Sequence, residues 1–352
     1  MERKNFLEET IKHLDLERTK TIGDLVEAMR FCSFQARSLA HCFDVYRSVL
    51  SDSDRPTIFF GLAGAMVPGG MRKIVVDMIG KKLIDVLVTT GANLYHDVCE
   101  AHGVRHYVGS TQVDDVKLKS LKINRIYDTF ADDIEFLRVD EAICALTSEF
   151  EPKEYSCREY LLELGLRTND DQSILHAAAK YGVPIFCPAL SDSSIGIALT
   201  KYYLEAKENG MKTLTINQIR DNYEIAQIKM KSKRTGMIFV GGGVPKNYVQ
   251  QLEVLLEVLD SRRGGHDYAI QITTDKPFWG GLSGATFEEA QSWGKISKSA
   301  SKASVIIDAT IGLPLLVGAV LQKCGDLIAD RPRLEFVWEE DRLREIRMGS
   351  HL

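Results

Sequence analysis

Short apolar runs alternate along the chain with longer stretches in which apolar residues recur at helical spacing. The apolar runs predict strands at 57–62, 84–90, 183–186, 237–240, 268–273 and 304–308. The longer stretches predict helices at 71–82, 171–181, 195–207, 246–259, 286–296 and 312–323. Strands that alternate with helices usually pair in parallel, so the pattern predicts an α/β fold with a mostly parallel, doubly wound central sheet.

The two ends of the chain and one internal region depart from this alternation. Leu25, Met29, Phe34, Leu39 and Phe43 recur at roughly helical spacing, which predicts one long helix over 22–50. The stretch 112–167 is charged and irregular, and we expect an excursion from the core there. We therefore expect a single Rossmann-like domain over 51–330, preceded by an N-terminal helical extension over 1–50 and followed by a tail over 331–352.

Composition and charge narrow the class of protein. The 352 residues carry a net charge of −5 with acidic and basic residues mixed, so the concentrated basic face of a nucleic-acid-binding protein is not expected. The first residues lack the apolar stretch of a signal peptide, and no run approaches the about 18 apolar residues of a membrane span. Seven cysteines without CxxC spacing favour reduced thiols in a cytoplasm, with no disulfide framework and no zinc site.

Three glycine-rich turns follow predicted strands. Gly241 and Gly242 lie in MIFVGGGVPKNY (237–248), Gly64 in GLAGAMVPGG (61–70), and Thr90 and Gly91 in TTGANLYHD (89–97). Glycines let backbone N–H groups approach a phosphate, and a following helix N-terminus favours its charge. Ligands of open α/β sheets bind at the carboxyl ends of the strands, where these turns lie. A nucleotide site is therefore predicted, although each turn alone could be structural.

Three polar residues each leave two interpretations open. Asp308 could accept a hydrogen bond from a ribose or adenine, or it could cap the helix that follows. Lys295 lies where a helix is expected to end, and could be a solvated cap favoured by the helix dipole. If it were buried against Trp293 near Glu289, its pKa would fall and its neutral amine could form a Schiff base. His96 could be an acid/base or a structural residue.

Seven segments, taken together, resemble the deoxyhypusine synthase family from about residue 20 to 325. They are FQARSLA (34–40), VTTGANLYHD (88–97), KINRIYDTF (122–130), PIFCPALSD (184–192), VGGGVPKN (240–247), EEAQSWGKI (288–296) and IDATIGLPLLV (307–317). The resemblance implies that NAD takes a hydride from a polyamine and that a lysine captures the four-carbon unit as an imine. An acceptor amine then displaces the lysine, and the new imine is reduced.

The resemblance also assigns roles to residues of this chain. Lys295 matches the lysine that forms the imine, and Trp293 and Glu289 match residues that line the amine tunnel. The remaining assignments are to the cofactor, and they fall on Gly64, Thr90, Gly91, Asp192, Gly241, Gly242 and Asp308. Family members are tetramers with sites between paired subunits, so a homotetramer is expected.

The chain departs from the family where the substrate binds. Two aspartates that hold spermidine fall on Ile197 and Leu282, and a histidine credited with proton transfer falls on Asn247, which is expected to contact the substrate. Near the cofactor, His96 replaces a glutamate and Ala65 an asparagine. These changes look like the bacterial deoxyhypusine synthase-like branch, some members of which make homospermidine from putrescine.

The departures lead to three hypotheses about function. The first is an NAD-dependent aminobutyl transferase that acts on small polyamines, with homospermidine-type synthesis. The second is an authentic deoxyhypusine synthase that uses spermidine to modify a lysine of a translation initiation factor. The third is an NAD-binding scaffold without catalysis, against which the intact Lys295, Trp293 and Glu289 argue.

Overall fold

A six-stranded sheet forms the centre of the protein, for which the computed structural model describes residues 3, 7–261 and 263–349. The strands lie in the order β11-β10-β9-β1-β2-β7, and every neighbouring pair is parallel. Their bounds are β1 Thr57–Leu62, β2 Val86–Thr89, β7 Ile185–Phe186, β9 Thr235–Val240, β10 His266–Thr273 and β11 Ile296–Ile306. The predicted doubly wound α/β fold is confirmed.

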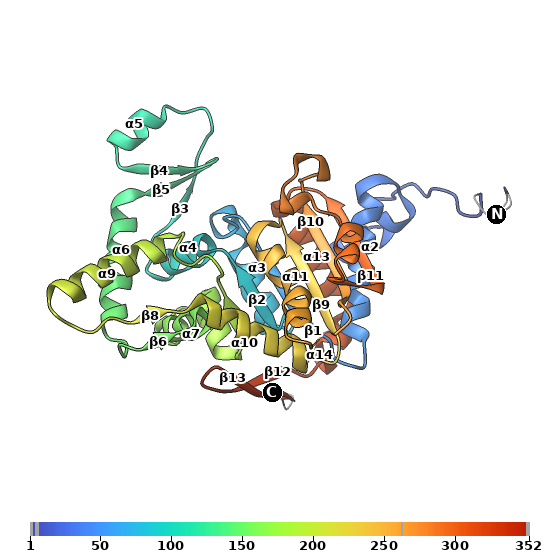
Figure 1. The fold of residues 1–352 in the computed structure, drawn as a ribbon. Coiled ribbons are helices and arrows are strands. Elements are labelled where there is room, and N and C mark those ends of the chain that lie inside the picture. The colour runs from blue at the N-terminus through green and yellow to red at the C-terminus, as the bar shows by residue number, and fades with distance from the viewer. Residues whose placement is uncertain (1–2, 4–6, 262, 350–352) are drawn as a thin grey trace.

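Helices cover both faces of this sheet (Figure 1). Alternate residues of one strand point to opposite faces, so Ile58 and Phe60 of β1 join one apolar cluster and Phe59 joins the other. The first cluster is completed by α1 Ile22–Ala28, α2 Phe34–Ser51, α3 Arg72–Gly80, α4 Gly91–Ala101, α7 Cys157–Arg167, α8 Ile174–Tyr181, α9 Ser194–Glu208 and α13 Ala309–Lys323. The second is completed by α10 Gln218–Lys231, α11 Gly243–Val258 and α12 Phe287–Ser292.

The chain order reverses inside the sheet. From β1 the chain moves outward through β2 to β7, and then returns to the other side of β1 with β9 before moving outward again through β10 to β11. The reversal therefore lies between β1 and β9. In open α/β sheets such a reversal opens a crevice outside the carboxyl ends of the two strands.

Two helix predictions were wrong in their extent. The single helix over 22–50 is divided into α1, a 3-10 turn at Met29–Phe31 and α2. The backbone becomes extended at Ser33, which is the N-cap of α2, so the helical hydrogen bonds cannot continue through it. The predicted helix over 286–296 ends at Ser292, and β11 starts at Ile296, eight residues earlier than the apolar run at 304–308 indicated.

The charged region between α4 and α8 contains regular structure. An antiparallel sheet of β3 His106–Val108, β5 Thr129–Asp132 and β4 Ile123–Ile126 carries α5 Asp115–Ser120, and together they form the arm that projects beside the core in Figure 1. The helix α6 Asp133–Ser148 then packs against α9. The strands β6 Glu154–Tyr155 and β8 Thr215–Ile216 form a further parallel pair.

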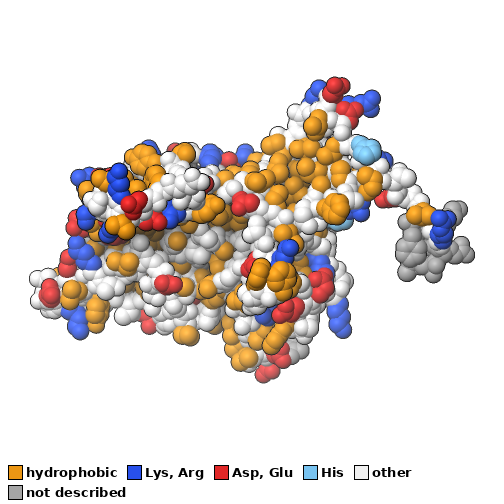
Figure 2. Space-filling model, turned by 90° about the horizontal axis from the view of Figure 1, so that it is seen from above, with side chains coloured by type: hydrophobic (Ala, Val, Ile, Leu, Met, Phe, Trp, Pro, Cys, Tyr) orange, Lys and Arg blue, Asp and Glu red, His pale blue; other side chains and the backbone are white. Residues whose placement is uncertain are grey.

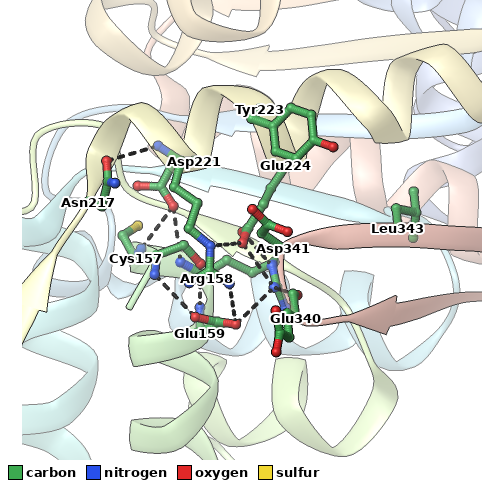
Figure 3. Close-up of polar contacts among 12 residues, drawn as sticks. Cys157, Arg158, Glu159, Asn217, Asp221, Tyr223, Glu224, Glu340, Asp341 and Leu343 are labelled. Atoms are coloured by element: carbon green, nitrogen blue, oxygen red, sulfur yellow. Dashed lines mark hydrogen bonds and ion pairs between the residues drawn. The ribbon is translucent and has the colours of Figure 1, made fainter. Parts of the chain in front are cut away.

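The last part of the chain forms a hairpin of β12 Leu334–Glu339 and β13 Arg342–Met348, which follows α14 Gly325–Asp330. A buried polar network ties this hairpin to α7 and α10 (Figure 3). The Arg158 guanidinium donates to Glu224 at 2.7 Å and to the Glu340 carbonyl at 3.3 Å, and Asp221 accepts from the Cys157 N–H at 2.8 Å. The tail is therefore held by charge-assisted hydrogen bonds as well as by the packing of Leu343.

Seen from above the view of Figure 1, hydrophobic side chains form a continuous area on the half of the molecule that leads to the N-terminal segment (Figure 2). Large exposed apolar residues of segments at the carboxyl edge of the sheet are Phe278, Trp279, Ile306 and Ile311. Within the described ranges, no helix has the length and hydropathy needed to span a membrane.

Candidate active site

A cavity of about 550 Å³ lies at the point where the chain order of the sheet reverses. Gly64 follows β1, Gly241 and Gly242 follow β9, and Asp308 follows β11, and all four line this cavity. The cavity also contacts the loop between β10 and α12 through Asp275, Trp279 and Ser283. The carboxyl edge thus gathers four of the predicted cofactor residues in one crevice, as the strand order requires.

The glycine turn after β9 requires glycine for two reasons. Gly241 has φ +70°, in the left-handed region that other residues rarely adopt. At Gly242, a Cβ would lie 2.3 Å from the Ser283 Cα, so the turn and the loop before α12 can approach only without a side chain there. The Gly243 N–H donates to the Ser283 Oγ at 3.1 Å and fixes that approach.

The cavity suits a dinucleotide. A glycine turn that leads into the N-terminus of α11 can hold a pyrophosphate, because unpaired backbone N–H groups and the helix dipole both favour negative charge there. The carboxylates of Asp275 and Asp308 line the cavity and could accept hydrogen bonds from ribose hydroxyl groups. Asp308 also accepts from the Thr310 N–H at 2.8 Å, so it is the N-cap of α13 as well as a lining residue.

The other three predicted cofactor residues lie outside the lining of this crevice. The Thr90 Oγ donates to the Gly64 carbonyl at 2.9 Å and joins the turn after β2 to the turn after β1. Gly91 lies against Ser193, because a Cβ on Gly91 would lie 2.4 Å from the Ser193 side chain. Asp192, the residue before Ser193, is exposed. Among the described residues, those that line the cavity do not include Thr90, Gly91 or Asp192.

Lys295 lies between α12 and β11, with its backbone fixed on both sides. Gly294, with φ +70°, turns the chain after the helix. The Lys295 N–H donates to the Ala290 carbonyl at 3.0 Å, and its own carbonyl accepts from the His266 N–H at 3.1 Å. His266 is completely buried at the start of β10, so the backbone of Lys295 is anchored to the core while its side chain remains half-buried.

The side chain of Lys295 lies beside Trp293 and within the electrostatic influence of Glu289. Its Nζ lies 5.4 Å from the centroid of the Trp293 ring, a distance at which an ammonium and an indole attract each other. Burial lowers the pKa of Lys295 below its usual value, and the Glu289 carboxylate opposes that shift. Trp293 is 63% exposed and Glu289 is exposed, so this part of the site is open at the surface of the single chain.

The backbone of Lys295 and the glycine cavity lie toward opposite ends of the sheet. Ile296, the residue after Lys295, pairs with His266 at the amino end of β10, whereas the cavity lies past Thr273 at its carboxyl end. Eight residues of strand separate these levels by roughly 23 Å. Asn247, the third predicted substrate residue, is half-buried in the first turn of α11, near the cavity end.

The residues at which the chain departs from the family pattern differ in burial. Ile197, on α9, is 63% exposed, and Leu282 is half-exposed in the loop before α12. His96 is buried, and its Nδ1 lies 3.0 Å from the His106 Nε2, which supports the structural interpretation of this histidine. Burial and the neighbouring His106 lower the pKa of His96 to about 4.

Sequence reasoning missed Lys246, which is completely buried beside the site. Its Nζ donates to the Gln271 Oε1 at 2.9 Å and to the Ala285 carbonyl at 2.5 Å. A lysine in the first turn of a helix is usually solvated, so nothing in the spacing distinguished it. Among the described residues, no group of three or more His, Cys, Asp or Glu side chains could hold a metal ion.

The fold and the site together define a doubly wound α/β protein with a glycine-turn cavity and a lysine suited to imine formation. The model of the deoxyhypusine synthase family matches residues 24–320. "Probable deoxyhypusine synthase 2" of Methanosarcina acetivorans is 48% identical over 326 residues, which cover 92% of each chain. The chain belongs to the deoxyhypusine synthase family, which is a family of transferases.

A less similar relative also supports membership of this family, and a solved structure supports the fold. The "Deoxyhypusine synthase-like protein" of Chlorobaculum tepidum is 37% identical over 329 residues, 92% of each chain. A crystal structure described as a candidate deoxyhypusine synthase from Entamoeba histolytica shares the fold, with a TM-score of 0.60 at 18% identity over 89% of this chain and 97% of that one. Membership of the family implies aminobutyl transfer, a polyamine substrate and an oligomeric assembly, and the family is generally NAD-dependent.

Proposed function

We propose that the chain is an NAD-dependent aminobutyl transferase that acts through an imine on Lys295 and uses small polyamines as donor and acceptor, as in homospermidine-type synthesis. The observation that carries the proposal is the setting of Lys295: a half-buried amine with a lowered pKa, fixed through its backbone, beside an indole face and a carboxylate. Lysine forms reversible imines only as the neutral amine, which this setting favours.

In this proposal, separate groups of residues bind the amine substrate and the cofactor. Trp293 and Glu289 would hold a cationic amine against Lys295, through the ring face and charge pairing respectively. Gly64, Gly241, Gly242 and Asp308 would hold NAD in the cavity, with Thr90, Gly91 and Asp192 in the adjoining turns and Asn247 toward the substrate. When bound, NAD supplies the hydride acceptor and donor that interconvert amine and imine.

The assembly that we propose is a cytoplasmic homotetramer in which one active site combines parts of two subunits. The separation of roughly 23 Å between the levels of Lys295 and the cavity within one chain supports this arrangement. The exposed Trp293 and the exposed apolar residues Phe278 and Trp279 support it too, because large exposed apolar areas mark association surfaces. All seven cysteines are free, as in cytoplasmic proteins.

The proposal of a small acceptor amine rests on the two positions at which the chain lacks the spermidine-binding aspartates of the family. Ile197 and Leu282 cannot pair with the ammonium groups of spermidine as the family's aspartates do. The runner-up is authentic deoxyhypusine synthase, in which spermidine donates to a lysine of a translation initiation factor. It is favoured by the names of the relatives that are 48% identical, from Methanosarcina acetivorans and Archaeoglobus fulgidus.

Trapping the imine tests the proposal. Purified protein is incubated with NAD and putrescine, spermidine or agmatine, reduced with borohydride, and mapped by mass spectrometry. A four-carbon amine adduct on Lys295 that is absent from Lys295→Ala and kept in Lys298→Ala is expected, and the amine that produces it identifies the donor. Transfer to the initiation factor and not to free amines would favour the runner-up. Bound NAD without any adduct would leave a non-catalytic scaffold.

A further inference from the structure

Two carboxylates line the cavity at the carboxyl edge, and one of them has an oxygen without a partner. Asp308 is used as the N-cap of α13, where its Oδ1 accepts from the Thr310 N–H at 2.8 Å. Asp275, half-buried in the loop between β10 and α12, accepts from the Lys276 N–H through its Oδ1 at 3.0 Å. Within the part of the chain that the structure describes, no group donates to the Asp275 Oδ2. This oxygen is therefore available to a ligand in the cavity.

The lysines near Asp275 do not bond to its carboxylate. The ammonium of Lys276 lies over the Phe278 ring, 5.9 Å from the centroid. Lys246 is within electrostatic range of Asp275, but its buried Nζ donates to the Gln271 Oε1 at 2.9 Å and to the Ala285 carbonyl. A half-buried carboxylate is most stable with a cation bonded to it, so Asp275 would gain from a cationic ligand.

The folded loop holds the carboxylate in place. The Asp275 N–H donates to the Thr273 Oγ at 3.1 Å, at the end of β10. A Cβ on Gly281 would lie 3.5 Å from the Asp275 Oδ2, so the carboxylate lies against the backbone of the returning part of the loop. A Cβ on Gly284 would lie 2.2 Å from the Lys276 carbonyl, so both ends of the loop are closely packed. The free oxygen is therefore positioned before any ligand binds.

An aromatic ring from the same loop completes the site. Trp279 lines the cavity together with Asp275 and is 70% exposed. A carboxylate and an indole ring bind an alkylammonium through charge pairing and cation–π attraction. Trp293 and Glu289 offer the same two groups beside Lys295. Two such pairs of groups suit a ligand that has an ammonium group at each end.

We propose that Asp275 and Trp279 bind the ammonium end of the polyamine substrate that does not react at Lys295. The proposal rests on the proposed function and narrows its substrate class to amines with a second, permanently charged end. The free Asp275 Oδ2 would accept from that ammonium, and the Trp279 ring would cover it. Leu282, the residue after Gly281, brings no charge, so the carboxylate of this loop comes from Asp275.

Isothermal titration of putrescine and spermidine into the whole protein, with NADH present, tests the proposal. NADH cannot accept a hydride, so the amine binds without being consumed. In Asp275→Asn the Kd of the amine should rise about tenfold, because the ammonium loses a charged acceptor. The Kd of NADH should stay within about twofold, because the asparagine amide still accepts from a hydroxyl group. Asp275→Glu keeps the charge and should lose less affinity for the amine, and Asp128→Asn at an exposed turn is the control.

An unchanged Kd for both amines in Asp275→Asn would overturn the proposal, and so would a wild-type protein that binds neither amine. A rise in the Kd of NADH alone would assign Asp275 to the ribose instead. The result is separate from that of imine trapping. Weaker amine binding in Asp275→Asn, together with no adduct on Lys295 in the wild type, would keep the ammonium site and reject the proposed chemistry. An adduct with unchanged amine binding in Asp275→Asn would do the reverse.

Discussion

Lys295 and Asp308 flank the same strand, with Lys295 directly before β11 and Asp308 two residues after it. Asp308 lines the glycine cavity at the carboxyl edge, whereas Lys295 is anchored beside His266 at the amino end of β10. A strand is nearly inextensible, so motion of the loops around it cannot bring these two backbone positions together. The two backbone positions of one chain therefore stay apart, which supports the proposed site that combines parts of two subunits.

Complementation between subunits should follow from this geometry. As homo-oligomers, Lys295→Ala is expected to be inactive, and Gly242→Ala is expected to lose most of its activity when NAD is kept near the Kd of the wild type. Mixed oligomers from co-expression should recover about a quarter to a half of wild-type activity, because some sites then combine an intact lysine from one chain with an intact glycine turn from another. The recovery is measured by purifying oligomers that carry two different tags. Mixed oligomers without activity would place both elements of each site in one chain.

Gly242→Ala should weaken cofactor binding without unfolding the protein. The added Cβ would lie 2.3 Å from the Ser283 Cα, so the loop before α12 must move away from the glycine turn. A loss of about 2 kcal/mol in NAD binding is expected for a displaced backbone contact of this kind. Isothermal titration gives the change in Kd. Gly325→Ala, where a Cβ meets nothing within 4 Å, is the control, and an unchanged Kd in Gly242→Ala would exclude this turn from the cofactor site.

The sequence predicted the edge of the sheet that binds a ligand better than it predicted the place of the reactive lysine. Strand and glycine signals fall together after β1, β2 and β9, so their common edge follows from parallel pairing alone. The start of β11, ISKSASK, alternates polar and small residues and carries no apolar run, so the strand was recognised only at its far end. Lys295 was therefore assigned to a helix end, and its level in the sheet could not be inferred.

The burial of Lys246 was equally hidden from the sequence. Its setting depends on Gln271 and Ala285, which are distant from it along the chain and reach it only through the sheet order. Likewise, the extended Ser33 between α1 and α2 interrupts a helical pattern that the apolar spacing alone continues. Local sequence patterns indicate helices, strands and their apolar faces. Which polar side chains become buried depends on contacts between segments that are distant in the sequence.

Removing the charge of Glu289 should make Lys295 more reactive and bind amines less well. The Glu289 carboxylate raises the pKa of Lys295, so in Glu289→Gln that pKa falls and the neutral fraction at pH 8 grows. An increase of about threefold in the acetylation rate of Lys295 is expected for a half-exposed pair. The KM for the amine should rise, because a cation loses its partner. Glu288→Gln provides the control, since Glu288 pairs with Lys302, and an unchanged rate in Glu289→Gln would contradict the prediction.

The buried carboxyl of Asp221 should make the stability of the whole protein depend on pH. Burial raises the pKa of Asp221 from 3.8 to about 7, and the nearby Glu224 adds to the shift. Between these values the folded protein holds a proton that the unfolded chain has lost, so the free energy of unfolding must fall as the pH rises from about 4 to about 7. The network of Figure 3 is therefore weakest above neutral pH.

Asp221→Asn removes this proton-linked term and keeps the acceptor for the Cys157 N–H. Relative to the wild type, we expect the variant to gain about 2 kcal/mol at pH 8 and little or nothing at pH 4, which flattens the decline of stability across that range. Urea unfolding at half-unit pH steps measures the slope, with Asp128→Asn at an exposed turn as the control. If the two slopes were the same with and without the carboxyl, Asp221 would have to be ionised in the folded protein throughout, and its charge would need a partner among the groups of α7 and α10.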